Sequence, residues 1–239
     1  MNLDNRSVII IGGGSGIGLG VARACLERGA RVVLAGRNRD KLERALTTLE
    51  AGERGRAIAA DVSREADVAR LFEQTPGAAH ALVTAADLAY QPIASFELEA
   101  ARRAVDSKLL GALLVAKYAA PRLAAGGSLT FTTGVATERP LPRGSMVAAV
   151  NGALNCFIRA AAIELAPLRV NALSPGWVDT ELWDIIGPGK AAAFAAKAER
   201  LPVGRIGTPA DLAHAAIFLM ENEFTTGTVL DVDGGHRFV

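Results

Sequence analysis

The chain has 239 residues, half of them apolar, and its 26 lysine and arginine residues nearly balance 25 acidic residues. This length and apolar content suffice for the core of one large domain. The balanced charge gives no indication of a nucleic acid or an anionic membrane as a partner, because both attract strongly basic surfaces. No basic-then-apolar leader opens the sequence and no uninterrupted apolar run reaches membrane-spanning length, so we expect a cytoplasmic protein.

Segments typical of strands and of helices alternate along the whole chain. Apolar, β-branched runs predict seven strands, at residues 8–11, 31–35, 57–60, 81–83, 128–133, 169–173 and 228–232. Helices are predicted at residues 19–28, 38–49, 64–73, 96–125, 144–166, 180–200 and 208–221, with interruptions near Asp106 and at residues 187–189. The alternation predicts one α/β domain over residues 1–239, a doubly wound Rossmann-type domain with a parallel seven-stranded sheet and helices on both faces.

The first strand runs directly into a glycine turn with the spacing Gly-x-x-x-Gly-x-Gly, and an amphipathic helix follows. Glycines let the backbone approach a pyrophosphate closely, and the first free N–H groups of the helix point at it. Glycines also build ordinary tight turns, but a strand before and a helix after favour a nucleotide site. The residues expected to line it are Gly12, Gly14, Ser15, Gly16, Ile17 and Gly18.

The end of the second strand indicates which nucleotide binds. An NAD-preferring fold usually has a carboxylate there for the ribose hydroxyls, but the chain reads Ala-Gly-Arg37-Asn38. A cation is disfavoured at the start of a helix unless an anion lies nearby. The guanidinium of Arg37 suits a phosphate. We therefore expect the adenosine 2′-phosphate of NADP(H), with a solvated arginine as the alternative interpretation.

These motifs resemble those of the short-chain dehydrogenase/reductase family over nearly the whole chain. The matching stretches are residues 12–18, 61–62, 168–176 with the following Val178 and Thr180, and residues 227–235. The resemblance implies that Asp61 and Val62 contact adenine. It also implies that Pro175, Gly176 and Val178 hold the nicotinamide carboxamide, that Thr180 reaches the carboxamide or the phosphates, and that Ala85 belongs to the cofactor site.

The chain departs from the family it resembles where the chemistry takes place. Family enzymes use a tyrosine and a lysine on the helix after the fifth strand, a serine at the end of that strand and an asparagine on the preceding helix. At these four positions the chain has Val147, Asn151, Thr133 and Lys108. Valine cannot donate the proton that a tyrosine gives to the carbonyl oxygen. The resemblance thus implies a rearranged active site.

Lysine and asparagine are exchanged relative to the family, and this favours a function for Lys108. Helical periodicity places Lys108 on the side of Ala112 and Val115, opposite Lys117. An inward ammonium needs a partner or a lowered pKa, and Thr133, Asp87, a water or the cofactor ribose are candidate partners. The alternative is a lysine that extends to the surface from a helix start.

We interpret Lys108, Thr133 and Asn151 as the candidate catalytic residues. Lys108 would supply the proton directly or through a water. Thr133 would hydrogen-bond the substrate oxygen, and Asn151 would hold that water or the ribose.

Four further features bear on partners. Residues 180–206, with their aromatic cluster around residues 187–189, predict a lid over the cofactor. The helix at residues 144–166 is apolar nearly all round, which predicts a homodimer or homotetramer. Cys25 and Cys156 are expected to be buried thiols rather than a disulfide. His80 and His214 have no second ligand at metal spacing, so no metal site is expected.

Three functions remain open at this point. The first is an NADP(H)-dependent oxidoreductase with a rearranged site for a small carbonyl or alcohol. The second is a non-catalytic NADP(H)-binding sensor or subunit. The third is a lyase or isomerase that uses Lys108.

Overall fold

The computed structural model describes residues 2–239 and contains one seven-stranded parallel sheet of order β3-β2-β1-β4-β5-β6-β7. The strand order reverses between β1 and β4, which creates a crevice at the carboxyl ends of the strands. The predicted fold class is confirmed. The strands are β1 Ser7–Ile11, β2 Arg31–Gly36, β3 Gly55–Ala59, β4 His80–Val83, β5 Ser128–Thr132, β6 Arg169–Pro175 and β7 Val229–Val232.

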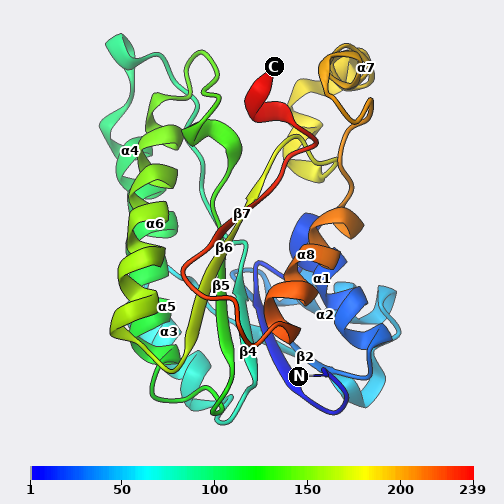
Figure 1. Cartoon of the computed structure of the whole chain (residues 1–239), viewed down its shortest axis with the longest axis vertical. Helices are drawn as coiled ribbons and strands as arrows, with labels where there is room; N and C mark the ends of the chain where they lie inside the picture. The colour runs from blue at the N-terminus through cyan, green and yellow to red at the C-terminus, as the bar shows by residue number, and fades with distance from the viewer. Residues whose placement is uncertain (1) are drawn as a thin grey trace.

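Helices cover both faces of the sheet (Figure 1). One face carries α1 Gly16–Glu27, α2 Arg39–Thr48 and α8 Pro209–Glu221, and the other carries α3 Glu65–Glu73, α4 Leu98–Ala104, α5 Gly111–Ala119 and α6 Ser145–Glu164. Strand β1 shows why both faces of the sheet are buried. Ile9 and Ile11 lie in the core under α3, α5 and α6, whereas Val8 and Ile10 lie in the core under α1, α2 and α8.

The predicted helix at residues 96–125 is shorter than expected, and the interruption predicted near Asp106 is a π-helical segment rather than a loop. Helix α4 continues through a π-helical segment, Val105–Leu110, directly into α5, which ends at Ala119. A π-helical turn inserts one residue into the helical repeat, so side chains on either side change phase without a loop. The segment contains Lys108. The next residue, Gly111, packs against Val62 so closely that a Cβ on Gly111 would come within 3.1 Å of the valine.

The predicted interruption in residues 180–200 is present. A 3₁₀ segment, Glu181–Gly189, precedes α7 Lys190–Arg200, and Gly187 between them has a φ of 63°. This part of the chain stands beyond the carboxyl ends of the strands, beside the last turn of the chain (Figure 1).

One packing prediction needs correction. Cys25 is buried, but Cys156 is exposed on α6; both are free thiols. Helix α6 is buried only on one face, because Ile163 on the opposite face is 82% exposed. By length and composition α6 is the one helix of residues 2–239 that could span a membrane, a test that core helices of globular proteins also pass.

Candidate active site

A cavity of about 710 Å³ lies at the carboxyl ends of the strands, where the strand order reverses. Its walls are the turns after β1 to β6, as expected for an open α/β sheet. The predicted cofactor residues in these walls are Gly12, Gly14, Ser15, Gly16, Ile17, Arg37, Asn38, Asp61, Val62, Ala85, Pro175 and Thr180.

The glycine turn has the shape that a pyrophosphate needs. Gly12 has a φ of 92°, and a Cβ there would lie 2.4 Å from Thr84 Oγ1. Gly18 lies outside the cavity wall; its Cβ would fall 2.3 Å from the Gly12 carbonyl oxygen, so this glycine allows α1 to start against the turn. Ser15, the residue before α1, makes no side-chain cap, which leaves the first N–H groups of the helix available for an anion.

A pair of cations lies at the end of β2. Arg37 is exposed and forms no ion pair with any residue from 2 to 239. Lys41, which the sequence analysis missed, lines the same cavity and donates from Nζ to Ser15 Oγ at 2.8 Å. The sequence did contain a signal for Lys41. Like Arg37, it places a positive charge at the start of a helix, where a cation is disfavoured unless an anion lies nearby.

Two of the predicted adenine-side residues also hold backbone in place. Asn38 caps α2, with Oδ1 accepting from the Lys41 N–H at 2.9 Å. Asp61 Oδ1 accepts from the N–H and the hydroxyl of Ser63, at 3.0 and 2.7 Å, and so fixes the turn after β3.

A second, smaller cavity of about 120 Å³ adjoins the first. Seven residues line both cavities and so lie where a cofactor and a substrate would meet: Ile17, Leu88, Lys108, Thr133, Pro175, Thr180 and Leu182. Three predicted residues line only the smaller cavity: Asn151, Gly176 and Val178.

Lys108 is the buried cation of the site. Its side chain lies inside, and Nζ donates to the Thr133 carbonyl oxygen at 3.1 Å. Burial lowers the pKa of Lys108 to about 8. Of the two protein partners considered from the sequence, Lys108 binds Thr133, through the backbone carbonyl rather than the hydroxyl. Asp87 instead faces Arg103 at 3.8 Å.

Thr133 and Asn151 differ in the hydrogen bonds that they can still form with a ligand. The Thr133 hydroxyl donates to the Leu173 carbonyl at 3.2 Å, so it offers a substrate only its lone pairs in this arrangement. Asn151 is buried on α6, and its Oδ1 has no hydrogen-bond partner in the described chain. A buried orphaned acceptor costs free energy unless a ligand or a water supplies a donor.

The smaller cavity has aromatic and basic walls that the sequence analysis did not assign. Trp177 and Trp183 stack with ring centroids 4.2 Å apart, and both line it together with Tyr90, Arg139 and His236. The predicted lid supplies Trp183, whose Nε1 donates to the Val178 carbonyl at 2.9 Å.

No group of three or more metal-binding side chains occurs in residues 2–239. The cradle described above fits a dinucleotide: a glycine turn without room for side chains, free helix N–H groups and a long cavity across the strand switch point. The fold and the cradle together define a dinucleotide-binding α/β protein.

Comparisons with known proteins give the family. The sequence model described as enoyl-(acyl carrier protein) reductase matches residues 12–237. The short-chain dehydrogenase/reductase ATR9 of Stachybotrys chlorohalonatus is 33% identical over 96% of both chains. The short-chain dehydrogenase/reductase malC of Malbranchea aurantiaca is 34% identical, over 98% of this chain and 95% of its own. This chain belongs to the short-chain dehydrogenase/reductase family.

Solved structures agree with the sequence relatives. The structure titled MalC reductase/Diels-Alderase from Malbranchea aurantiaca superposes with a TM-score of 0.93 at 32% identity, covering 99% of this chain and 98% of that one. A small-chain dehydrogenase in complex with NADPH superposes with a TM-score of 0.84 at 30% identity, covering 99% and 100%. The protein is thus an oxidoreductase of the short-chain type, a family that uses NAD(P)(H).

Proposed function

We propose that the protein is an NADP(H)-dependent oxidoreductase that acts on a small carbonyl or alcohol through a rearranged active site. One observation carries the proposal: Lys108, a buried ammonium whose pKa burial lowers to about 8, lies in the wall shared by the two cavities. A buried titratable group with a shifted pKa in a cleft is a candidate for proton transfer. The family's proton donor position is Val147, in the wall of the smaller cavity.

Each residue of the site has its own role in the proposed reaction. The larger cavity would hold the nicotinamide cofactor, which would supply or accept the hydride. Lys108 holds a proton at Nζ, with one hydrogen directed at Thr133 O and two available to the substrate oxygen or to an intervening water. Asn151 Oδ1 accepts from that water or from a ribose hydroxyl, which satisfies its orphaned lone pairs. The tryptophan pair excludes water from the smaller cavity.

NADP(H) rather than NAD(H) is the cofactor in this proposal. Arg37 and Lys41 place two cations beside the end of β2, and residues 35–38 include no carboxylate for the ribose hydroxyls. The guanidinium and the ammonium are the groups that bind a phosphate most strongly. A structural neighbour in complex with NADPH supports this preference.

The test is NADPH consumption over a panel of small ketones and aldehydes, followed by Lys108→Met on any substrate found. Loss of the proton donor should lower turnover by roughly 10²–10⁴. Lys117→Met is the matched control, because Lys117 is an exposed lysine of the same helical stretch and pairs with Glu65 at 2.7 Å. Turnover that survives Lys108→Met would remove Lys108 from the mechanism.

Two other functions each have an observation in their favour. Valine at position 147 favours a non-catalytic NADP(H)-binding protein, for which NADPH binds without turnover of any substrate. The neighbour whose title names a reductase and a Diels-Alderase favours a lyase, isomerase or other reaction without net cofactor oxidation. Product formation at constant NADPH concentration would identify the latter.

A further inference from the structure

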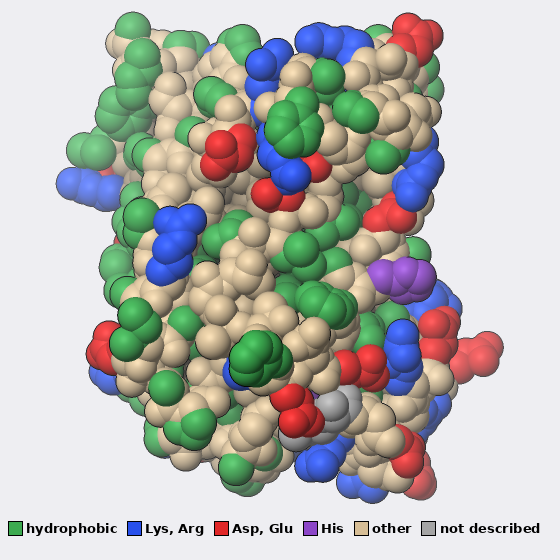
Figure 2. Space-filling model, viewed as in Figure 1, with side chains coloured by type: hydrophobic (Ala, Val, Ile, Leu, Met, Phe, Trp, Pro, Cys, Tyr) green, Lys and Arg blue, Asp and Glu red, His purple; other side chains and the backbone are tan. Residues whose placement is uncertain are grey.

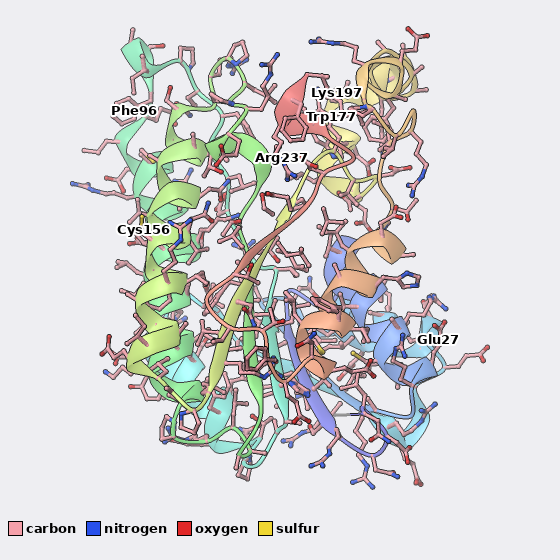
Figure 3. All side chains as sticks on the ribbon, viewed as in Figure 1. Glu27, Phe96, Cys156, Trp177, Lys197 and Arg237 are labelled. Atoms are coloured by element: carbon pink, nitrogen blue, oxygen red, sulfur yellow. The ribbon has the colours of Figure 1, made fainter. Side chains whose placement is uncertain are left out.

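The smaller cavity carries more positive charge at its rim than the proposed reduction of a neutral carbonyl requires. Arg139 lines the cavity, and Lys197 of α7 lies over the ring of Trp177, another lining residue, at 5.9 Å from its centroid. Figure 3 shows Lys197 and Trp177 together beside the last turn of the chain. Arg200 follows one helical turn after Lys197, at the end of α7.

These cations have no acidic partner. Among residues 2–239, no carboxylate lies within 4.0 Å of the side-chain nitrogens of Arg139, Lys197 or Arg200. Nearby Arg237 differs, because it pairs with Asp231. The three cations are close enough to act on one another: burial, then Arg200 and Arg139, lower the pKa of Lys197. Like charges at a cavity with apolar walls attract an anion.

A polar side chain inside the cavity also lacks a partner. His236 is 1% exposed and lines the cavity, and its Nδ1 has no hydrogen-bond partner in the described chain. Burial lowers its pKa to about 4, and Lys197, Arg139 and Arg200 act in the same direction while Asp233 opposes them. The imidazole is therefore neutral at pH 7 and keeps one ring N–H as a donor.

We propose that the smaller cavity binds a substrate with a carboxylate, held by Arg139, Lys197 and the imidazole of His236. Lys108 and Asn151 line the same cavity, and Lys108 also lines the larger one, whereas Arg139 and His236 line only the smaller one. The reacting carbonyl would therefore lie toward Lys108, and an apolar segment of the substrate would contact the tryptophans. This assignment rests on the proposed function for the identity of the reacting group. A cavity of about 120 Å³ fits a small organic acid rather than a long chain.

The chain contains a reporter for this site. Its two tryptophans, Trp177 and Trp183, both line the smaller cavity, so all tryptophan fluorescence originates there. Binding can therefore be measured without turnover, in protein saturated with NADP⁺. Binding of the acid without turnover would count against the proposed reduction alone. Turnover without a preference for the acid would count against the carboxylate site alone.

The experiment titrates cyclohexanecarboxylate and its amide, cyclohexanecarboxamide, and follows the fluorescence. The acid should bind about tenfold more tightly or better, since a carboxylate gains charged hydrogen bonds that the amide does not. Added salt should weaken only the acid. Arg139→Met combined with Lys197→Met should abolish the preference, whereas Arg31→Met, which removes one exposed positive charge at the amino end of β2, should retain it.

Several results would overturn the assignment. Equal binding of acid and amide, or no quenching by the acid at its solubility limit, would show that the cations do not select a carboxylate. Retention of the preference in the double variant would place the anion elsewhere. Tighter binding of cyclohexyl phosphate than of cyclohexanecarboxylate would assign the site to a phosphate ester instead.

Discussion

In addition to its proposed role in proton transfer, the buried Lys108 lowers the stability of the folded protein. Its ammonium is removed from water and has a single protein acceptor, the Thr133 carbonyl oxygen. Burial lowers its pKa from 10.5 to about 8. Because the unfolded chain keeps the ordinary value, the charged lysine favours the unfolded state at neutral pH.

Lys108→Met should therefore raise the free energy of unfolding at pH 7, by about 1–3 kcal/mol, because methionine occupies similar space without the charge. The sign follows from proton binding. Between pH about 8 and 10.5 the unfolded state binds more protons, so the wild-type protein gains stability as the pH rises and the difference shrinks. Urea unfolding at pH 7 and pH 10 measures both values. A variant less stable than the wild type at pH 7 would contradict the prediction.

The phosphate-binding cations make a second prediction for single residues. Arg37→Ala and Lys41→Met should each weaken NADPH binding by about 1–3 kcal/mol, the contribution of one charged hydrogen bond, and leave NADH binding nearly unchanged. Calorimetric titration with both cofactors measures the selectivity. Arg44→Ala, an exposed arginine one turn further along α2, serves as the control. If the unmodified protein binds NADH as tightly as NADPH, the assignment of NADP(H) is wrong.

At the scale of elements, α8 shows a complete N-terminal capping box. The Thr208 N–H donates to Asp211 Oδ2 at 2.7 Å, the Thr208 hydroxyl accepts from the Asp211 N–H, and Pro209 opens the helix. Arg205 adds two contacts of 2.7 Å to the same carboxylate. These hydrogen bonds, Arg205 first, hold the pKa of Asp211 well below its usual range.

Asp211→Asn should lower the free energy of unfolding by about 1 kcal/mol at pH 7, the usual value of a helix cap. The stabilisation by the carboxylate is complete above the unfolded-state pKa of about 4 and is lost as the pH falls through the lower folded-state pKa. Thermal unfolding of both proteins from pH 7 to pH 2 should show the difference shrink steadily below pH 4, because the unfolded chain takes up the proton before the folded protein does. Asp40→Asn in the first turn of α2 is the control. A difference that does not depend on pH would contradict the linkage.

For the whole molecule, the main surface feature is an exposed apolar face on α5 and α6. Ile163 is 82% exposed, and Leu110 and Leu113 lie on the same side of the sheet with 46% and 39% exposure. Apolar side chains follow this edge of the molecule in Figure 2, and Figure 3 places Cys156 on it. Monomeric proteins rarely leave such faces in water.

We expect two or four copies of the chain to associate through this face. Ala153 lies exposed on it, so Ala153→Arg should shift the protein to a monomer by placing a charge in the interface. Sedimentation velocity at micromolar concentration measures the distribution, with Ala195→Arg on exposed α7 as the control. A monomeric unmodified protein would contradict the prediction.

Much of the fold and of the cofactor cradle could be predicted from the sequence because both depend on local patterns. Buried parallel strands require β-branched runs, helices require caps and a 3.6-residue period, and a pyrophosphate turn requires glycines at a fixed spacing. Helical phase relative to Lys117 favoured an inward Lys108 but left a surface lysine open, and the burial of Lys108 decides between the two. What the phase could not show was the π-helical segment, since it depends on how the helix packs over the end of β3 at Val62.

The sequence by itself determined the doubly wound fold and led us to expect a nucleotide at the glycine turn and a rearranged active site. Only the tertiary structure decided which distant side chains share a cavity. Lys41 meets Ser15 across 26 residues, and His236 joins Arg139 and Trp177 from three separate segments. No periodicity and no fixed spacing in the sequence indicates such contacts. They arise because parallel strands bring their carboxyl ends, and every loop that follows them, to one edge of the sheet.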